Sequence, residues 1–389
     1  MAPPPPPPPK TLPYNPKKRL TPATTVLKPL SQAEIAMYKT WVGTGTMKLQ
    51  KRKREASPDT ESAPPAKKRL TRDAVAVVDH YNSRPDVGVL QRQDSPIIGL
   101  KNFNNWIKSV LIQRYAYPAL IGESIAKGAR TRRDRKLFGR VLDIGCGKGG
   151  DINKWTKAKI ADYVGVDIAA VSVNQARQRW EGMRVNRFNA RFAPLDCYEY
   201  PLSHALDERY LRAPPIDVVS MQFCMHYAFD SEKRARRMLE NVSEYLRPGG
   251  AFIGTIPNAE SLLDRLDELP DDAQDLEFGN DVYKIKFDER QHEGLYGHKY
   301  SFFLQDAVDD VPEYLVHWTP FVKLAEEYGL RLVYRSEFHS VYQEFQEEKE
   351  FADLLVRMKV INAEGESAMD EDQWEAANIY IAFAFEKIS

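Results

Sequence analysis

The chain has 389 residues, 43% of them apolar, which is enough for one large domain or two modest ones. Its formal net charge is zero, yet residues 1–72 hold 15 Lys and Arg against 4 Asp and Glu, so a basic arm precedes an acidic body. No apolar run of about 18 residues, no apolar signal core and no metal-like cysteine spacing are present, which excludes membrane-spanning and disulfide-rich secreted proteins. We therefore expect a soluble intracellular protein with reduced Cys146, Cys197 and Cys224.

The arm, residues 1–72, contains 14 of the 26 prolines, including an unbroken run from Pro3 to Pro9. Such a run adopts polyproline II, so we expect a disordered, solvated arm; a docking strip for a proline-binding domain is the alternative. Two basic clusters, residues 51–54 and 67–69, are separated by 12 residues. This spacing is typical of a bipartite nuclear localisation signal, which predicts a nuclear protein and a nuclear import carrier as a partner. The same charges would attract RNA nonspecifically.

From residue 73 the pattern becomes that of a folded domain, which we expect to span residues 73–389. Apolar side chains recur at helical spacing in residues 102–115, and further helices are predicted at 172–183 and 231–246. Strands are predicted at 140–144, 163–167, 189–195, 216–223, 251–256, 330–338 and 379–386. This alternation predicts an α/β, Rossmann-like fold with a mostly parallel seven-stranded sheet and helices on both faces.

Two irregular segments interrupt the alternation. Arg247–Gly250, with the sequence R-P-G-G, is expected to end the preceding helix before the fifth strand begins. Residues 258–325 are rich in acidic and aromatic side chains, and we expect them to form an insertion that builds a wall of the substrate pocket.

The strongest motif is V-L-D-I-G-C-G-K-G-G-D at residues 141–151, in which an apolar strand ends at Asp143 and enters a glycine-dense turn. Gly145, Gly147 and Gly149 alternate, so the motif matches neither the dinucleotide-binding G-x-G-x-x-G nor the P-loop. Glycines allow a sharp turn and a close approach to a ligand. An acid beside such a turn suits a ligand with an ammonium group and no phosphates, such as S-adenosylmethionine.

Two further acids end the strands that follow. Asp167 lies about 20 residues after the turn, where an acid accepts hydrogen bonds from ribose hydroxyls in folds of this kind. Asp196 follows the next strand-like run and could accept from the adenine amine. A single aspartate of this type more often caps a helix, but three acids at successive strand ends predict a class I S-adenosylmethionine-dependent methyltransferase.

Several segments closely resemble the eukaryotic, fungal-like family of mRNA cap guanine-N7 methyltransferases. They are F-N-N-W-I-K-S at 103–109, the glycine motif at 143–155, M-Q-F-C-M-H-Y-A-F-D-S at 221–231, P-E-Y-L-V-H-W at 312–318 and I-Y-I-A-F-A-F-E-K at 379–387. The resemblance spans residues 74–389 and leaves out the arm. It implies methyl transfer from S-adenosylmethionine to guanine N7 of the GpppN cap of nascent mRNA. It also implies association with transcribing RNA polymerase II and other capping enzymes. From the sequence itself we expect neither a metal nor a membrane to take part.

The resemblance implies the residues of the site as well. Those that would contact S-adenosylmethionine are Lys108, Gly145, Asp167, Asp196, Gln222 and Tyr227. Those that would contact the cap are Asn104, Asn105, Lys148, Lys154, Arg179, His226, Glu313 and Tyr380.

The chemistry of these side chains fits the implied roles. Lys108 is a compact cation for the methionine carboxylate, and the other basic residues could meet the triphosphate. Glu313 could accept from guanine N1–H and its exocyclic amine together, which selects guanine over adenine, while Tyr227 or Tyr380 could cover a base. A histidine in the position of His226 is usually a packed core residue, but within this segment we expect it to contact the cap. No second metal ligand stands at a suitable spacing from it.

Guanine N7 carries a lone pair and no proton, so its methylation needs no general base. We therefore expect no catalytic acid or base, only proximity and orientation. Two alternatives remain: another RNA methyltransferase of the same fold, such as a ribose 2′-O enzyme that needs a base, and a non-catalytic nuclear RNA-binding scaffold. The intact turn and its three acids argue against the scaffold, and the glycine spacing argues against an oxidoreductase.

Overall fold

The computed structural model describes residues 71–84, 93–126, 137–184 and 188–388, with the side chains of 123–126 left out. The predicted arm, apart from its last two residues, and both basic clusters lie outside the described residues. The described chain forms a seven-stranded sheet in the order β10-β11-β5-β4-β1-β2-β3 and a four-stranded sheet in the order β6-β7-β8-β9.

All seven predicted strands belong to the larger sheet. They are β1 (Phe138–Ile144), β2 (Ile160–Asp167), β3 (Asn189–Pro194), β4 (Ile216–Gln222), β5 (Leu246–Pro257), β10 (Leu330–Glu337) and β11 (Tyr380–Lys387). Strands β1 to β5 pair in parallel, and β11 runs antiparallel to both of its neighbours, β5 and β10. The predicted α/β fold with a mostly parallel seven-stranded sheet is therefore confirmed.

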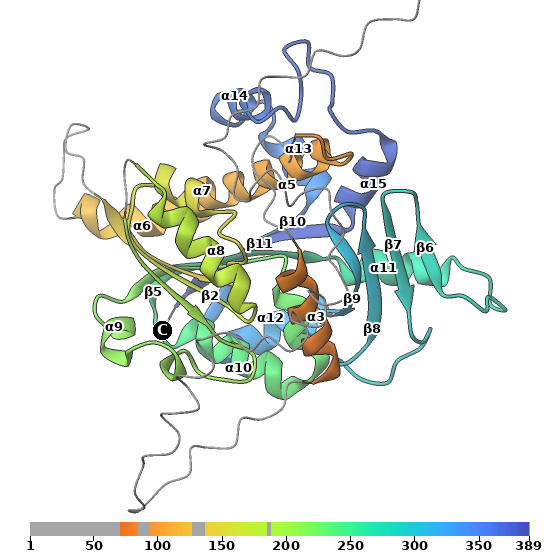
Figure 1. Ribbon diagram of the computed structural model, residues 1–389, viewed down its shortest axis with the longest axis horizontal. Helices are drawn as coiled ribbons and strands as arrows, with labels where there is room; N and C mark the ends of the chain where they lie inside the picture. The colour runs from red at the N-terminus through yellow and green to blue at the C-terminus, as the bar shows by residue number, and fades with distance from the viewer. Residues whose placement is uncertain (1–70, 85–92, 127–136, 185–187, 389) are drawn as a thin grey trace, which may run out of the picture. The chain divides into compact units, whose positions relative to one another are not determined.

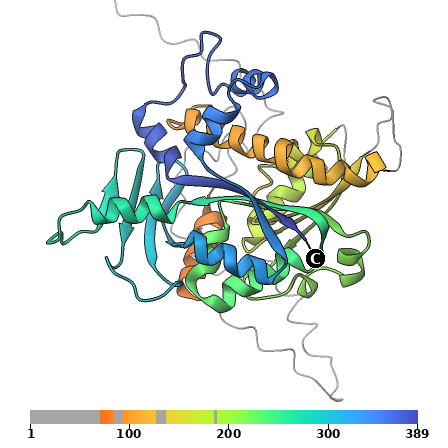
Figure 2. The same ribbon diagram turned by 180° about the vertical axis from the view of Figure 1, so that it is seen from behind.

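Side chains alternate between the two faces of this sheet, which is why helices cover both (Figure 2). In β4, Val218 belongs to the apolar cluster beneath α5 (Ile98–Leu111), α7 (Ile152–Lys157) and α8 (Ala170–Glu181), whereas Val219 belongs to the opposite cluster. That second cluster includes side chains of α10 (Glu232–Ser243) and α12 (Trp318–Glu327). The strand ends that carry polar residues therefore lie between two layers of helices.

The segment before β5 differs from the prediction. Helix α10 ends at Ser243 and β5 begins at Leu246, so the expectation that Arg247–Gly250 separates helix from strand is wrong. These four residues instead bulge out of β5, because its pairing with β4 passes from Ile216↔Leu246 to Val218↔Ala251. The bulge accommodates Pro248, which has no N–H for the ladder.

The helix predicted at 102–115 is α5, continued by a π-helical turn, η2 (Ile112–Ala116), and by α6 (Tyr117–Ala126). Its apolar face is buried against α13 (Phe338–Phe345), α14 (Lys349–Arg357) and α15 (Glu371–Asn378), as Figure 1 shows. The Trp106 indole donates to the Phe351 carbonyl over 3.0 Å, and the Phe103 and Trp374 rings lie 5.0 Å apart. This packing fixes the polar face of α5, which carries Asn105 and Lys108.

The predicted insertion forms α11 (Ala259–Asp267) and the antiparallel strands β6 (Glu277–Gly279), β7 (Tyr283–Phe287), β8 (Lys299–Leu304) and β9 (Val308–Tyr314). Its expected end at residue 325 is too late, because α12 begins at Trp318 and packs against β10 of the main sheet. A helix outside all predicted elements, α3 (Arg72–Ser83), lies against β9 and α8 (Figure 1). None of the described helices is long and apolar enough to cross a membrane.

Candidate active site

A cavity of about 270 Å³ lies at the carboxyl ends of the parallel strands, where ligands bind in open α/β sheets. Strands β1, β2 and β4 end at it, the segment after β3 borders it, and α3 and the end of β9 close its other side. Five of the six residues predicted to contact the cofactor line this cavity: Gly145, Asp167, Asp196, Gln222 and Tyr227.

The glycine turn after β1 brings the backbone close to β4. Gly145 has a φ of 71°, and a Cβ placed there would lie 2.6 Å from the sulfur of Cys224, so a larger residue does not fit. Gly147, with a φ of 50°, also lines the cavity, but a Cβ placed there would meet no atom within 4 Å. The turn therefore leaves open space for a ligand beside Gly147.

Asp167, at the end of β2, faces this turn. Its carboxylate accepts hydrogen bonds from the backbone N–H groups of Gly147 and Ala169, each over 2.8 Å. Burial raises the pKa of Asp167, and these two hydrogen bonds oppose the rise. Since each carboxylate oxygen has about two acceptor positions, Asp167 keeps capacity for hydroxyl donors in the cavity.

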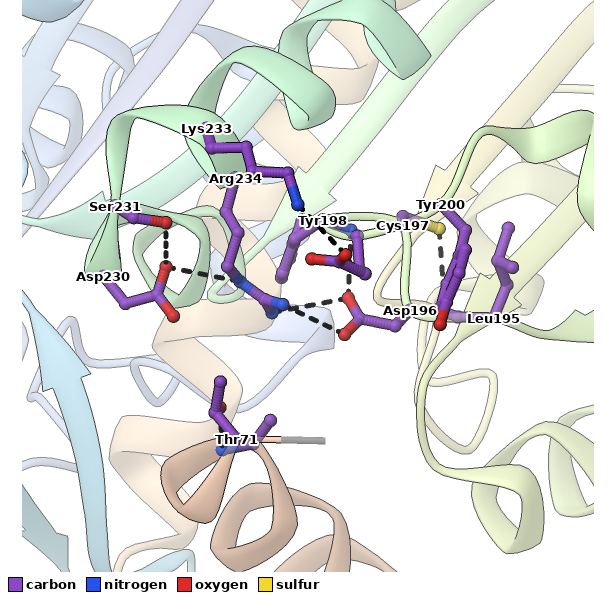
Figure 3. A network of polar contacts seen from close by, with 12 residues as sticks. Thr71, Leu195, Asp196, Cys197, Tyr198, Tyr200, Asp230, Ser231, Lys233 and Arg234 are labelled. Carbon is purple, nitrogen blue, oxygen red and sulfur yellow. Dashed lines mark hydrogen bonds and ion pairs between the residues drawn. The ribbon is translucent and has the colours of Figure 1, made fainter. Parts of the chain in front are cut away.

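Asp196 and Gln222 lie farther along the same cavity. Gln222 is held at the end of β4 by hydrogen bonds with Ser220 and Thr255. Asp196 accepts from the backbone N–H of Tyr198 over 3.0 Å and forms an ion pair with Arg234 of α10 over 3.2 Å (Figure 3). Arg234 lines the cavity too, and no sequence motif pointed to it.

Asp143, the first acid of the motif, lies behind the turn and does not line the cavity. Its carboxylate accepts a hydrogen bond of 2.7 Å from the hydroxyl of Tyr163 on β2. Burial and the charge of Asp151 raise the pKa of Asp143 to about 7, against the effect of the Tyr163 hydrogen bond. Its hydrogen bond connects β1 to β2, and it does not meet the ligand space directly.

Lys108, the sixth predicted cofactor residue, does not line the cavity but joins a charged cluster beside it. Its ammonium and that of Lys154 share the carboxylate of Asp151, at 2.9 and 2.7 Å. Lys154 also donates to the Asn105 side chain over 2.6 Å. Burial favours a raised pKa for Asp151, but the two lysines outweigh it and hold the pKa well below its usual range. The structure thus brings Lys108 together with two of the predicted cap residues.

A second cluster of predicted residues surrounds the buried carboxylate of Glu313 on β9. Tyr227 donates to its Oε1 over 3.1 Å, and Tyr300 of β8 donates to its Oε2 over 2.9 Å. Nε2 of His226 lies 3.2 Å from Oε1, but within the described residues neither of its buried ring nitrogens makes a hydrogen bond. Burial raises the pKa of both tyrosines well above the usual value, so both hydroxyls remain donors.

The other predicted cap residues are more scattered. Tyr380, at the start of β11, is buried with its ring 4.9 Å from that of Phe223. Asn104 on α5 has a buried side-chain oxygen that accepts no hydrogen bond from the residues that the structure describes. Lys148 donates to the Arg84 carbonyl over 2.5 Å, and Arg179 stands in the last turn of α8; neither lines the cavity.

Helix α3 supplies a wall that sequence reasoning missed. Thr71, which caps the helix, and Asp73, Val77 and Tyr81 line the cavity from this side. The Tyr81 and Tyr227 hydroxyls lie 3.3 Å apart, so α3 is connected to the Glu313 cluster. No helix was predicted at residues 72–83, and nothing in the sequence showed that this segment would reach the ends of β1 and β2.

The three cysteines, Cys146, Cys197 and Cys224, are free and buried, and the last two line the cavity. Burial raises the pKa of all three thiols, which disfavours the reactive thiolate. In the part of the chain that the structure describes, no three His, Cys, Asp or Glu side chains gather in a way that could hold a metal ion.

The strand order, the glycine turn at the end of β1 and the acids after β2 and β3 define an α/β methyltransferase of the Rossmann-like class. A family model described as the mRNA (guanine-N(7))-methyltransferase domain matches residues 66–388, and the chain belongs to this family.

Relatives from fungi and plants share this similarity. An mRNA cap guanine-N(7) methyltransferase of Cryptococcus neoformans is 52% identical over 90% of this chain and 54% of its own length. Proteins of the same name from Schizosaccharomyces pombe, with 45% identity, and Oryza sativa, with 42%, align with 80% of this chain and with 81% and 80% of theirs. The chain thus spans about half the length of the Cryptococcus relative.

A solved S-adenosylmethionine-dependent methyltransferase from Clostridium acetobutylicum aligns with 73% of this chain and 97% of its own. The sequence identity is 15% and the TM-score is 0.39.

Proposed function

We propose that this chain transfers the methyl group of S-adenosylmethionine to N7 of the guanine cap of mRNA. The observation that carries the proposal is the contact between two sites: Tyr227 lines the strand-end cavity and also donates to the buried carboxylate of Glu313. A donor bound in the cavity and a guanine bound at Glu313 would therefore be neighbours.

The cavity suits the methyl donor by the chemistry of its walls. Asp167 would accept hydrogen bonds from the ribose hydroxyls, and Asp196 from the adenine amine. Gly145 and Gly147 would allow the ligand to approach the backbone, and Gln222 would border the adenine. Lys108 would meet the methionine carboxylate from the cluster around Asp151.

The Glu313 cluster suits guanine. Its carboxylate is buried, and within the described residues each of its oxygens accepts from one tyrosine hydroxyl. A buried carboxylate is stabilised by hydrogen-bond donors, and guanine carries two of them, N1–H and its exocyclic amine, on one edge. Adenine offers no N1–H. The unpartnered nitrogens of His226 and oxygen of Asn104 leave further hydrogen-bonding capacity for the cap.

The remaining predicted cap residues would hold the rest of the substrate. Lys154 and Asn105, with Lys148 and Arg179, would meet the triphosphate bridge, and Tyr380 would cover the base.

The reaction needs positioning and no proton transfer. The N7 lone pair forms a bond to the methyl carbon while the carbon–sulfur bond breaks, and its electrons stay on sulfur, which becomes a neutral thioether. The positive charge moves from the sulfonium to the purine ring. Holding the two reactants in line can contribute about 7–11 kcal/mol in favourable cases. The residues named above would bind and orient the two ligands and exclude water.

The site of action and partners follow from the substrate. A protein that caps nascent mRNA would act in the nucleus, and the two basic clusters of the arm would engage an import carrier. RNA polymerase II and the other capping enzymes would be its neighbours there.

To test the proposal, the protein is incubated with labelled S-adenosylmethionine and with RNAs that end in GpppN, in pppN or in an already methylated cap. We expect transfer to GpppN alone, at a rate independent of pH while substrates and fold are unchanged. Equal transfer to all three RNAs would contradict the proposed acceptor. Transfer to none of them would favour the non-catalytic scaffold.

A further inference from the structure

Arg234 is a buried cation that lines the donor cavity. The proposed reaction assigns no role to this side chain. Arg234 stands in the first turn of α10, and its side chain is 10% exposed. Two acids that line the same cavity, Asp196 and Asp230, lie on either side of it. Arginine is almost never fully buried unless it is paired, and both acids that pair with Arg234 line the ligand cavity.

The guanidinium is fixed at several points, as Figure 3 shows. Its two terminal nitrogens donate to the two oxygens of Asp196, over 3.2 and 3.4 Å. Nε lies 3.3 Å from Oδ1 of Asp230 in an ion pair, although within the described residues it makes no hydrogen bond, and this oxygen accepts from Ser231 over 2.9 Å. The Tyr198 ring lies 5.7 Å from the guanidinium carbon. Such a planar fork allows Asp196 one orientation only, which a lysine ammonium could not impose.

The orientation matters because of what Asp196 can accept. Among the described residues, its Oδ1 accepts hydrogen bonds from the Tyr198 N–H and from one nitrogen of Arg234, whereas Oδ2 accepts from Arg234 alone. With about two acceptor positions on each oxygen, one position on Oδ2 remains for a ligand. An ionised carboxylate held this way can only accept, so it favours an amino group and repels a carbonyl oxygen.

We propose that Arg234 is a positioning residue that determines which purine the donor cavity accepts. By fixing Asp196 as an acceptor, it favours a base with an amino group at position 6, as in adenine, over one with a carbonyl there, as in hypoxanthine. This inference rests on the proposed function, which places the methyl donor in the cavity and its base near Asp196. The competing explanation is that Arg234 only ties α10 to the segment after β3.

The experiment measures binding of two ligands to the full chain by calorimetry: S-adenosylhomocysteine and its deaminated analogue, S-inosylhomocysteine. The wild-type protein should bind the adenine ligand at least about tenfold more tightly, because sites built around a hydrogen bond reject analogues that cannot make it. Arg234→Met should reduce this ratio about tenfold, mainly by weakening the adenine ligand. Arg234→Lys, which keeps the charge without the fork, should give an intermediate ratio.

Two more variants separate the explanations. Asp196→Asn carries an amide that both donates and accepts, so it should bind the two ligands with similar affinity, and adding Arg234→Met should change the ratio no further. Lys233→Gln is the matched control: it removes a neighbouring cation of α10 that is 68% exposed and pairs with Glu199, and it should keep the wild-type ratio.

The possible failures are distinguishable. An unchanged ratio in Arg234→Met, or an equal loss of affinity for both ligands, overturns the proposal, and the second result would assign Arg234 a merely structural role. Thermal unfolding of each variant without ligand shows whether it is folded, and Arg234→Lys serves if Arg234→Met is not. If the wild-type protein binds neither ligand, the proposed function fails together with this inference. If it binds the adenine ligand and methylates capped RNA, only the assignment of Arg234 is at stake.

Discussion

The hydroxyl of Tyr227 donates to Oε1 of Glu313 over 3.1 Å, and this bond links a residue that lines the cavity at the strand ends to the buried carboxylate on β9. The two residues are 86 positions apart in the chain, one in the turn after β4 and the other on β9. Because the bond crosses between the proposed donor and acceptor sites, substitutions around it should separate the binding of the two substrates.

Glu313→Gln should reduce methylation of capped RNA by about 100-fold or more while S-adenosylhomocysteine still binds with nearly wild-type affinity. An amide turns one oxygen into a donor that opposes guanine N–H groups. It also removes the negative charge beside a ring that becomes positive during the reaction, so kcat should fall along with cap affinity. Steady-state kinetics and calorimetry measure the two effects. Glu326→Gln, on the exposed side of α12, is the control and should behave like wild type. A loss of cofactor affinity equal to the loss of activity would show that Glu313 is misassigned.

Tyr227→Phe and Tyr300→Phe make a matched pair, because each removes one hydroxyl from Glu313. Tyr227 also lines the cavity and lies 3.3 Å from the Tyr81 hydroxyl, whereas Tyr300 does neither. Tyr227→Phe should therefore weaken the binding of both substrates several-fold, whereas Tyr300→Phe should weaken the binding of capped RNA only. Each lost hydrogen bond contributes about 1 kcal/mol. Separate KM values for the two substrates test this. Identical profiles for the two variants would contradict the division of the site.

Gly145→Ala should destabilise the protein and weaken cofactor binding. The positive φ of 71° costs about 1–2 kcal/mol for an alanine, and the new methyl group would press on the sulfur of Cys224 at 2.6 Å. Gly150→Ala is the control, because a Cβ there meets no atom within 4 Å. Urea unfolding and calorimetry with S-adenosylhomocysteine report the two effects. Equal stability of the two variants would mean that the turn adapts.

Asp143→Asn should change how stability depends on pH. Burial raises the pKa of Asp143 to about 7 in the folded protein, from an ordinary value of 3.8. Between these values the folded chain keeps a proton that the unfolded chain releases, so the stability that the neutral carboxyl contributes at low pH is lost as pH rises to about 7. The amide of the Asp143→Asn variant cannot ionise, so this variant should gain stability relative to wild type from pH 4 to pH 8.

Urea unfolding at several pH values provides the measurement for Asp143. The exposed Asp271→Asn serves as its control and should follow the wild-type curve. Parallel curves for Asp143→Asn and wild type would count against a raised pKa in the folded protein.

The main sheet could be predicted from the sequence because its strands are short apolar runs. The polar residues that mark the site stand at the carboxyl ends of these runs. Asp167 and Asp196 could be placed at one edge by this rule alone, since parallel strands end together. The turn at Arg247–Gly250 misled the prediction because proline and glycine signal a break equally well in a loop and in a bulge.

Other parts of the site depend on contacts that no local pattern reveals. Arg234 lies in a run with Arg236 and Arg237, and nothing in the sequence distinguishes the three. In the folded protein Arg234 is buried, whereas Arg236 and Arg237 pair with glutamates on the surface. Lys108 was expected to be available to a ligand carboxylate, yet its partner in the structure is Asp151, 43 positions away. Such pairings arise from tertiary structure and leave no periodic signal in the chain.

Helix α3 has a practical consequence for anyone who shortens this protein. Thr71, Asp73, Val77 and Tyr81 belong to the wall of the cavity, although they precede the first strand by more than fifty residues of chain. A fragment cut anywhere between Thr71 and Ser83 would keep both sheets and would lose one side of the ligand site. Purified fragments for binding or screening work should therefore begin upstream of Thr71, and inactivity of a shorter one says nothing about the longer protein.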